Sequence, residues 1–199
     1  MADQLSIRET KRLQTKERLL GAAIAEFKRS GMADADVGAI VSAAGVAHGT
    51  FFFHFPTKVH VLFELERREE ERMVKQFRQF LGGKQDLPSA LHEAVKLVAG
   101  LERRLGAVLF KDFLAAHFSP TRPPAEEGTD HPLIVFLAQE MERARGSGEI
   151  DTDVTPMNSA VFFLLGLYAL LITTNDSPER KSMLKDFVER TLRSIGHRD

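Results

Sequence analysis

Two short stretches of the chain carry side chains that occur in reaction centres, and neither has the complete spacing. His92 and Glu93 begin like the zinc-binding helix of a metalloprotease, but Lys96 stands where the second histidine ligand is required. Residues 82–85 combine glycines with a lysine, but they lack the earlier glycine and the hydroxyl residue of a phosphate-binding loop. The chain has no cysteine, which excludes thiolate catalysis and cysteine-ligated metal sites. We therefore expect no catalytic residue, no metal site and no cofactor, and we do not expect an enzyme.

Residues 36–55 have the types and spacing of a DNA-reading motif. Asp36 is a typical N-cap residue before one short apolar helix, and a second short helix is expected from about His48. Gly45 suits the left-handed conformation that closes a turn between them, and Val46 would fill the space between the two helices. Two helices joined by a three-residue turn with glycine form a helix-turn-helix, whose second helix enters the DNA major groove.

Residues around this motif follow the pattern of a known family. They are the stretches 15–23 and 44–58 together with Phe27, Gly31, Val37 and Ile40. In these positions the chain resembles the TetR family of bacterial transcriptional regulators, over roughly residues 15–63. The chain length, the divergent helical remainder and the stretch 148–153 before a long apolar helix are also similar to that family.

The resemblance implies a set of DNA-contacting residues. Thr50 would reach a base edge or a phosphate, Gly49 would let the backbone lie close to DNA, and the ring of His48 would read a base. His54 and Lys58 would hold phosphates, although a packing role is an open alternative for His54. The full implied set is Asp36, Ala47, His48, Gly49, Thr50, Phe52, Phe53, His54 and Lys58.

The chain departs from the family pattern at two of these positions. Ala47 and Phe52 stand where the family commonly has serine and tyrosine, so two hydroxyls that usually bond phosphate oxygens are absent. We expect the affinity to depend more on the lysine and arginine residues of the arm at 8–18.

Four phenyl rings between residues 51 and 55 cannot all point inward on a helix with 3.6 residues per turn. Phe51 and Phe55 are expected in the core. Phe52 or Phe53 is then exposed, and contact with a thymine methyl group is one possible role for the exposed ring.

The elements that must position these residues are helical throughout the chain. Apolar residues recur at helical spacing, and no period-two strand pattern competes. Start and stop signals predict an all-α fold of about nine helices, at residues 14–30, 37–44, 48–54, 57–81, 88–104, 106–118, 132–145, 156–175 and 178–195. Prolines predict a long loop at 119–132, whose order stays open.

The composition is that of an ordinary globular protein, with 43% hydrophobic residues and a net charge of −1 over 199 residues. The first 60 residues are slightly positive and the remainder slightly negative, which on its own indicates only a solvated face. No signal peptide is visible, and the apolar run 160–172 has the length of a buried helix rather than of a membrane span. We expect a cytoplasmic protein with no membrane partner.

The resemblance also implies two domains with separate tasks. An N-terminal arm and a three-helix helix-turn-helix domain would occupy residues 1–58, and a larger helical domain for effector binding and dimerisation would occupy 59–199. Aromatic residues with one histidine are compatible with a pocket for an uncharged or weakly polar hydrophobic effector, and plain core packing is the alternative for each of them. These residues are Phe110, Phe113, His117, Phe136, Phe162 and Phe163. A buried imidazole such as that of His117 would need a hydrogen-bond partner.

The last two helices are implied to pair two subunits. A helix that is apolar nearly all round, as 160–172 is, must be covered on every side, and a second subunit supplies that cover. The candidate interface residues are Leu164, Leu167, Leu171, Leu184, Phe187 and Thr191. A two-fold homodimer predicts a palindromic operator with half-sites one helical turn, or a multiple of it, apart.

These observations together predict a dimeric regulator that binds double-stranded operator DNA and acts as a repressor that a small hydrophobic ligand releases. One alternative keeps the DNA binding and gives the second domain only dimerisation or a protein partner. Another is an all-α enzyme that uses His117 with a carboxylate such as Asp112, and no motif supports it.

Overall fold

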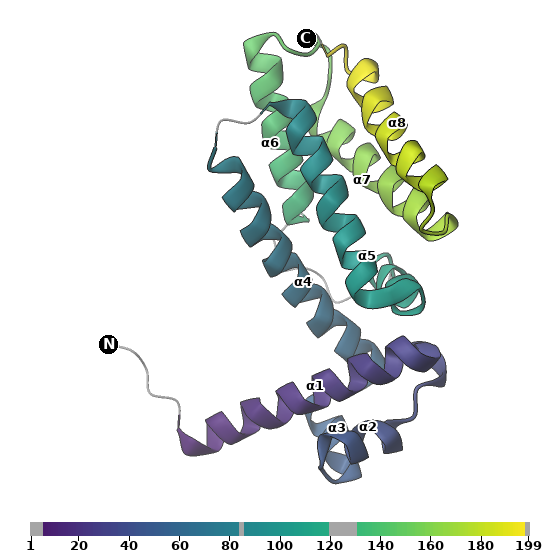
Figure 1. The fold of residues 1–199 in the computed structure, drawn as a ribbon. Helices are drawn as coiled ribbons and strands as arrows, with labels where there is room; N and C mark the ends of the chain where they lie inside the picture. Colours follow the sequence, from purple (N-terminus) through teal and green to yellow (C-terminus); the bar gives the residue numbers. More distant parts are fainter. Residues whose placement is uncertain (1–5, 84–85, 120–130, 198–199) are drawn as a thin grey trace. The chain divides into compact units, whose positions relative to one another are not determined.

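A computed structural model describes residues 6–83, 86–119 and 131–197, and all regular structure in these ranges is helical (Figure 1). The all-α prediction is confirmed. In chain order the helices are α1 (Ile7–Asp34), α2 (Val37–Ala44), α3 (His48–His54), α4 (Lys58–Leu81), α5 (Leu87–His117), α6 (Pro132–Ser147), α7 (Pro156–Thr173) and α8 (Pro178–Ser194). Most of the loop predicted at 119–132 lies outside the described residues.

The difference between the nine predicted helices and the eight helices of the described chain arises within α5. This helix contains both predicted segments, 88–104 and 106–118, and Gly106 between them has non-helical angles of φ 77° and ψ 159°. The break therefore falls where the sequence placed it, and α5 consists of two helical segments joined by a kink at Gly106. A backbone conformation of this kind is open almost only to glycine.

Helix α1 begins at Ile7, seven residues before the predicted start at residue 14. Its N-cap is Ser6, whose side-chain oxygen accepts a hydrogen bond from the Glu9 amide at 3.2 Å, while the Ser6 amide donates to Glu9 Oε2 at 2.9 Å. This reciprocal capping box satisfies amides that a helix terminus otherwise leaves without partners. It gives the polar arm an ordered start that apolar periodicity could not reveal.

The chain divides into two compact units, which are described separately. The first takes its described residues from Met1–Arg67 and Leu105–Arg122, and the second from Arg68–Arg104 and Pro123–Asp199. The unit change within α5 lies next to Gly106. The predicted division between residues 58 and 59 falls at the start of α4, and as a boundary between functions it stays a prediction.

The core of the first unit is formed by one face of α1 and the short helices beside it. Fully or almost fully buried side chains come from each of these elements: Leu19, Ala23, Phe27, Ile40, Phe51, Phe55, Val61 and Leu62. Figure 1 shows α2 and α3 beside the C-terminal half of α1, with the N-terminal turns of α1 extending beyond them. The second part of α5 joins this unit through Asp112, whose Oδ2 accepts a hydrogen bond from the Met32 amide at 2.6 Å.

In the second unit α6 packs on α7, and α7 packs on α8. The ring of Phe77 in α4 lies 5.7 Å from that of Phe136 in α6, and the only tyrosine of the chain, Tyr168, is buried on α7. Arg180 of α8 is 3% exposed and makes a two-pronged ion pair with Glu102 of α5, at 2.9 and 2.6 Å. Breaking a buried pair of this kind leaves an uncompensated charge, so it fixes the start of α8 against α5.

Helix α7 is, in the described part of the chain, the one single helix with the length and apolar composition of a membrane span. The bent pair α2 and α3 passes the same test if it is counted as one span. Core helices of soluble proteins pass this test too, and α7 buries Ala160, Phe163, Leu167 and other residues inside its unit.

Candidate nucleic-acid interface

The turn between α2 and α3 has the conformation predicted for it. Gly45 has φ 64° and ψ 44°, and its amide donates to carbonyls of the last turn of α2, while the Val46 amide donates to the Val41 carbonyl at 3.0 Å. Asp36 caps the other end of α2, since its Oδ1 accepts from the Gly38 amide at 2.8 Å. The N-cap role of Asp36 is confirmed, and contact with DNA stays a prediction.

Helices α2 and α3 meet at an angle of 95°. Helices of a helix-turn-helix cross at about 90–120°, so the geometry is that of the predicted motif. The Ile40, Val41 and Phe51 side chains are buried on the inner sides of these two helices. The inner sides of the short helices therefore pack in the core, and the outer side of α3 is exposed to solvent.

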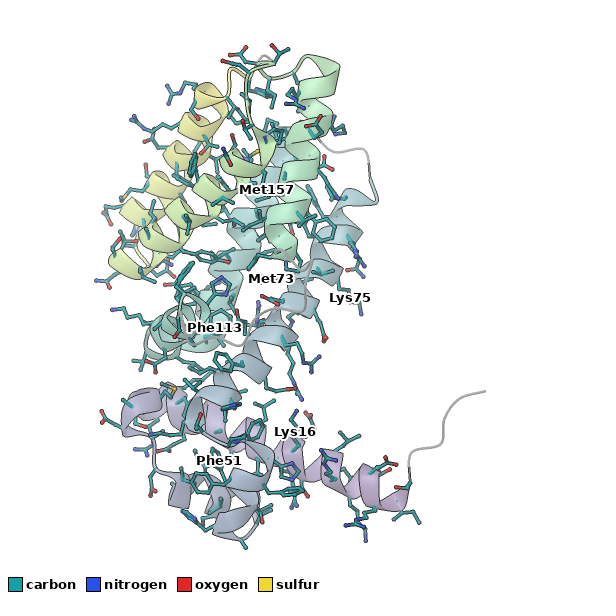
Figure 2. The ribbon with its side chains drawn as sticks, turned by 180° about the vertical axis from the view of Figure 1, so that it is seen from behind. Lys16, Phe51, Met73, Lys75, Phe113 and Met157 are labelled. Atoms are coloured by element: carbon teal, nitrogen blue, oxygen red, sulfur yellow. The ribbon has the colours of Figure 1, made fainter. Side chains whose placement is uncertain are left out.

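The phenyl rings of α3 divide between core and surface as the helical period requires. Phe51 is 0% and Phe55 2% exposed, whereas Phe52 is 47% and Phe53 72% exposed. The expected core positions are confirmed, and both remaining rings are exposed rather than one. Figure 2 shows Phe51 within the N-terminal unit.

The other predicted residues of α3 lie on the exposed side or at its edge. His48 and Gly49 are exposed and Thr50 is half-buried. A Cβ atom at Gly49 would meet nothing within 4 Å, so the protein itself does not require glycine there. A close approach of the backbone to DNA would supply that requirement, and it stays a prediction, as do the contacts of Ala47, His48 and Thr50.

His54, at the end of α3, is surrounded by positive charge. Partial burial, followed by the charges of Arg12 and Lys16, lowers the pKa of the His54 imidazole from its ordinary value. Lys16 lies 5.8 Å from the centre of the Phe55 ring and pairs with Glu64 of α4 at 2.9 Å. Burial and these two cations disfavour the imidazolium in the free protein, and an anion bound beside the ring would oppose the effect of the cations.

Lys58 is engaged by the protein itself. Its Nζ donates to the Ala33 carbonyl at 2.6 Å and to the Ala35 carbonyl at 3.2 Å. The ammonium thus binds carbonyls where the end of α1 leads into α2, a role that the sequence did not reveal. An ammonium group has three N–H donors, and these two bonds use two of them. The third could still contact a phosphate.

The basic arm is an ordered part of α1. Arg8, Lys11 and Arg12 are exposed, and Lys16 is half-buried. Arg8, Arg12 and Lys16 follow one another at four-residue spacing, which places them on one face of the helix. This same face carries the buried side chains of α1 further along, so the arm turns its cations toward the side on which the short helices lie.

The predicted effector residues fall into different units and environments. Phe110 and Phe113 are buried in the first unit, where His117 Nδ1 contacts Glu66 Oε1. His117 has the partner that burial demands, and Glu66, itself 4% exposed, is a residue that the sequence did not indicate. In the second unit Phe163 is buried and Phe136 half-buried.

Phe162 is exposed, unlike the other residues predicted to line the pocket. Its side chain is 69% exposed on α7, because it precedes Phe163 by one position and points away from the core that Phe163 enters. Phe162 therefore lines no enclosed space within its chain.

Three of the six predicted dimer residues are buried within the chain, and the interface itself stays a prediction. Leu164, Leu167 and Leu171 are at most 2% exposed because they form the core side of α7, so they offer no surface to a partner. Phe187 is half-buried and stacks on Phe163 at 5.2 Å, and Leu184 and Thr191 are half-buried on α8. The exposed apolar side chains of these two helices are instead Met157, Phe162, Leu165, Ile172 and Met183.

Comparisons with known proteins agree with this geometry. Residues 19–65 match the model of the family described as bacterial regulatory proteins, tetR family. The HTH-type transcriptional regulator UidR of Escherichia coli strain K12 is 24% identical over 164 residues, which cover 82% of this chain and 83% of UidR.

Two solved structures share the fold over most of the chain. The transcriptional regulator FadR from Bacillus subtilis, in complex with stearoyl-CoA, has a TM-score of 0.67 at 14% identity, covering 90% of this chain and 98% of FadR. RolR in complex with resorcinol also has a TM-score of 0.67, at 18% identity, covering 95% of this chain and 91% of RolR. The family match covers the helix-turn-helix described above, so residues 19–65 form a domain of the type found in bacterial regulatory proteins of the tetR family.

Proposed function

We propose that the protein is a transcriptional repressor that binds a palindromic operator as a homodimer and leaves it when a small hydrophobic molecule binds the helical part of the chain. The observation that carries this proposal is the pair α2 and α3, at 95°, with the outer face of α3 exposed inside the matched residues. In this assignment α3 enters the major groove, and the protein works in the cytoplasm on bacterial DNA.

The DNA contacts divide by chemistry. Arg8, Arg12 and His54 would neutralise phosphates and fix the position of α3, and the exposed residues of α3 would read bases. Ala47 and Phe52 contribute no hydroxyl, so the arm carries more of the phosphate binding than in relatives with serine and tyrosine there.

Dimerisation is assigned to the exposed apolar side of α7 with α8. Phe162, Leu165 and Ile172 lie at helical spacing on one side of α7, and Met183 adds an exposed apolar side chain from α8. Pairing with a second copy would remove this surface from water, and two copies related by a two-fold axis present two recognition helices to a palindrome.

Selection of bound sequences from a random pool of duplex DNA tests the proposal. An enriched palindrome whose binding weakens with salt is the expected result. Enrichment of no sequence, even at low salt, would overturn it.

The effector is tested by thermal unfolding with added ligands, because a compound that binds the folded state raises the Tm. Structures similar to this chain hold stearoyl-CoA and resorcinol, so an acyl-CoA and a phenol are the first probes. The expected ligand raises the Tm and lowers operator affinity. If a broad set of apolar compounds does neither, the helical domain dimerises or binds a protein partner without a small effector.

A further inference from the structure

The recognition helix carries a side chain whose chemistry fits one particular group of the major groove. Phe53 is 72% exposed, and its ring contact is with the adjacent His54, edge to face at 5.1 Å. Phe52 is less exposed and packs against Phe51 at 5.3 Å and His48 at 5.6 Å. Phe53 is thus the apolar side chain of α3 that the protein uses least for its own packing.

The surroundings of Phe53 indicate what covers it. Burial, followed by the charges of Arg12 and Lys16, lowers the pKa of His54, the next residue along the chain, so two cations act at the end of α3. A helix with an exposed apolar ring and with cations acting at its C-terminal end suits a polyanion that also presents apolar groups. Duplex DNA has this combination, because its phosphates flank a groove in which methyl groups are exposed.

In the major groove the apolar group that differs between base pairs is the C5 methyl of thymine. A phenyl ring makes no strong hydrogen bond to a base edge, so it cannot select guanine, cytosine or adenine through their donors and acceptors. It gains from contact with a methyl group and gains nothing from the bare C5 position of cytosine.

We propose that Phe53 is a specificity-determining residue that reads a thymine methyl group, so that each operator half-site requires thymine at the position facing this ring. The inference rests on the proposed function and deepens it, since it names the chemical group that α3 recognises. His54 and the basic arm hold the neighbouring phosphates, which brings the ring to the base edge.

The test replaces each thymine of the selected operator, one at a time in both half-sites, by deoxyuridine. This base lacks the C5 methyl group and keeps the same hydrogen bonds. Burial of one methyl group corresponds to a change in affinity of about fourfold at each such position. We expect one thymine position, or two adjacent ones, to show this loss with the wild-type protein.

The variant Phe53→Ala is expected to bind the thymine and deoxyuridine operators equally at that position. Val108→Ala is the control, because it shortens an exposed apolar side chain of α5, outside the DNA-contacting residues, and should keep the preference for thymine. Far-UV circular dichroism checks that both variants fold. We expect them to fold because the replaced side chains are exposed.

Three results would overturn the inference. Wild-type protein that binds every deoxyuridine operator as tightly as the original makes no methyl contact. A Phe53→Ala variant that keeps the full thymine preference assigns the contact to another residue. Wild-type protein that binds no duplex selectively fails at the earlier step and overturns the proposed function together with this inference.

Discussion

At the scale of single residues, two basic side chains near the recognition helix have different tasks. Partial burial and the charges of Arg12 and Lys16 lower the pKa of His54, whereas Lys58 is bound to two carbonyls of its own chain. The resemblance implies a phosphate contact for both, but only the structure separates a group whose charged form is disfavoured from one that binds carbonyls at the end of α1.

The pKa of His54 is expected to lie below its ordinary value in the free protein. The unfolded chain then binds this proton more tightly than the folded chain, so His54 lowers the free energy of unfolding as the pH falls below about 6.5. An NMR titration of the imidazole measures the pKa directly. Arg12→Gln should raise it toward the ordinary value, and Lys28→Gln, on the same helix, should leave it unchanged. An unshifted His54 in the wild type would contradict this electrostatic description.

Lys58→Ala is expected to lower the free energy of unfolding by about 1 kcal/mol, because two carbonyls lose a charged donor. Lys75→Ala, at an exposed position of the same helix, is the control and should have little effect. Chemical denaturation of the three proteins measures the difference. Equal stability of the Lys58 variant and the wild type would show that the lysine serves DNA alone.

At the scale of elements, apolar periodicity predicted the bounds of helices that pack against the core. The short helices 37–44 and 48–54 have the predicted bounds, and the break at Gly106 lies at the predicted place. Periodicity failed where tertiary packing gives no signal, as in the polar first turns of α1, whose capping box of Ser6 and Glu9 was the available clue. It also could not say which side of the apolar helix α7 faces inward, because apolar residues stand on nearly every side.

The arm of α1 is expected to bind phosphates. Replacing Arg8 and Arg12 together by glutamine should reduce the slope of log K against log salt by about one for each phosphate that the protein no longer neutralises. Lys28→Gln removes one charge near the other end of α1 and should change the slope little. Binding isotherms at several salt concentrations give the slopes. Equal slopes for the double variant and the wild type would assign the phosphates to other residues.

Gly106 interrupts α5 through its backbone angles and not through crowding. A Cβ atom there would meet nothing within 4 Å, so Gly106→Ala isolates the strain of φ 77° and ψ 159°. We expect a loss of about 1–3 kcal/mol. Gly21→Ala, also without a neighbour within 4 Å but inside a regular helix, should instead stabilise by about 0.5–1 kcal/mol. Thermal unfolding distinguishes these opposite signs, and stabilisation by both variants would show that α5 tolerates straightening.

At the scale of the whole molecule, the helical fold and the helix-turn-helix were predicted from the sequence, but the exposed apolar surface of the last two helices was not. The leucines predicted to face a partner on α7 are buried, and the exposed side of this helix carries Phe162 and Leu165. The sequence shows that α7 is apolar on nearly every side. Only the tertiary structure shows which side packs against other helices of the same chain and which side remains exposed.

Phe162→Glu is expected to shift the dimer toward monomer, because pairing would bury a carboxylate without a partner. Sedimentation velocity over a range of concentrations measures the association, and operator affinity should fall with it. Gln76→Glu adds the same charge at an exposed position of α4 and should leave the dimer intact. A Phe162→Glu protein that remains dimeric would place the interface elsewhere.

The single tyrosine is an intrinsic fluorescence probe of one helix. The chain has no tryptophan, and Tyr168 is buried on α7, the helix whose exposed side is assigned to pairing. Excitation near 280 nm therefore yields emission from one known position. Its quenching and anisotropy follow the environment and tumbling of α7 in unlabelled protein, so dissociation on dilution and ligand entry become visible without a dye.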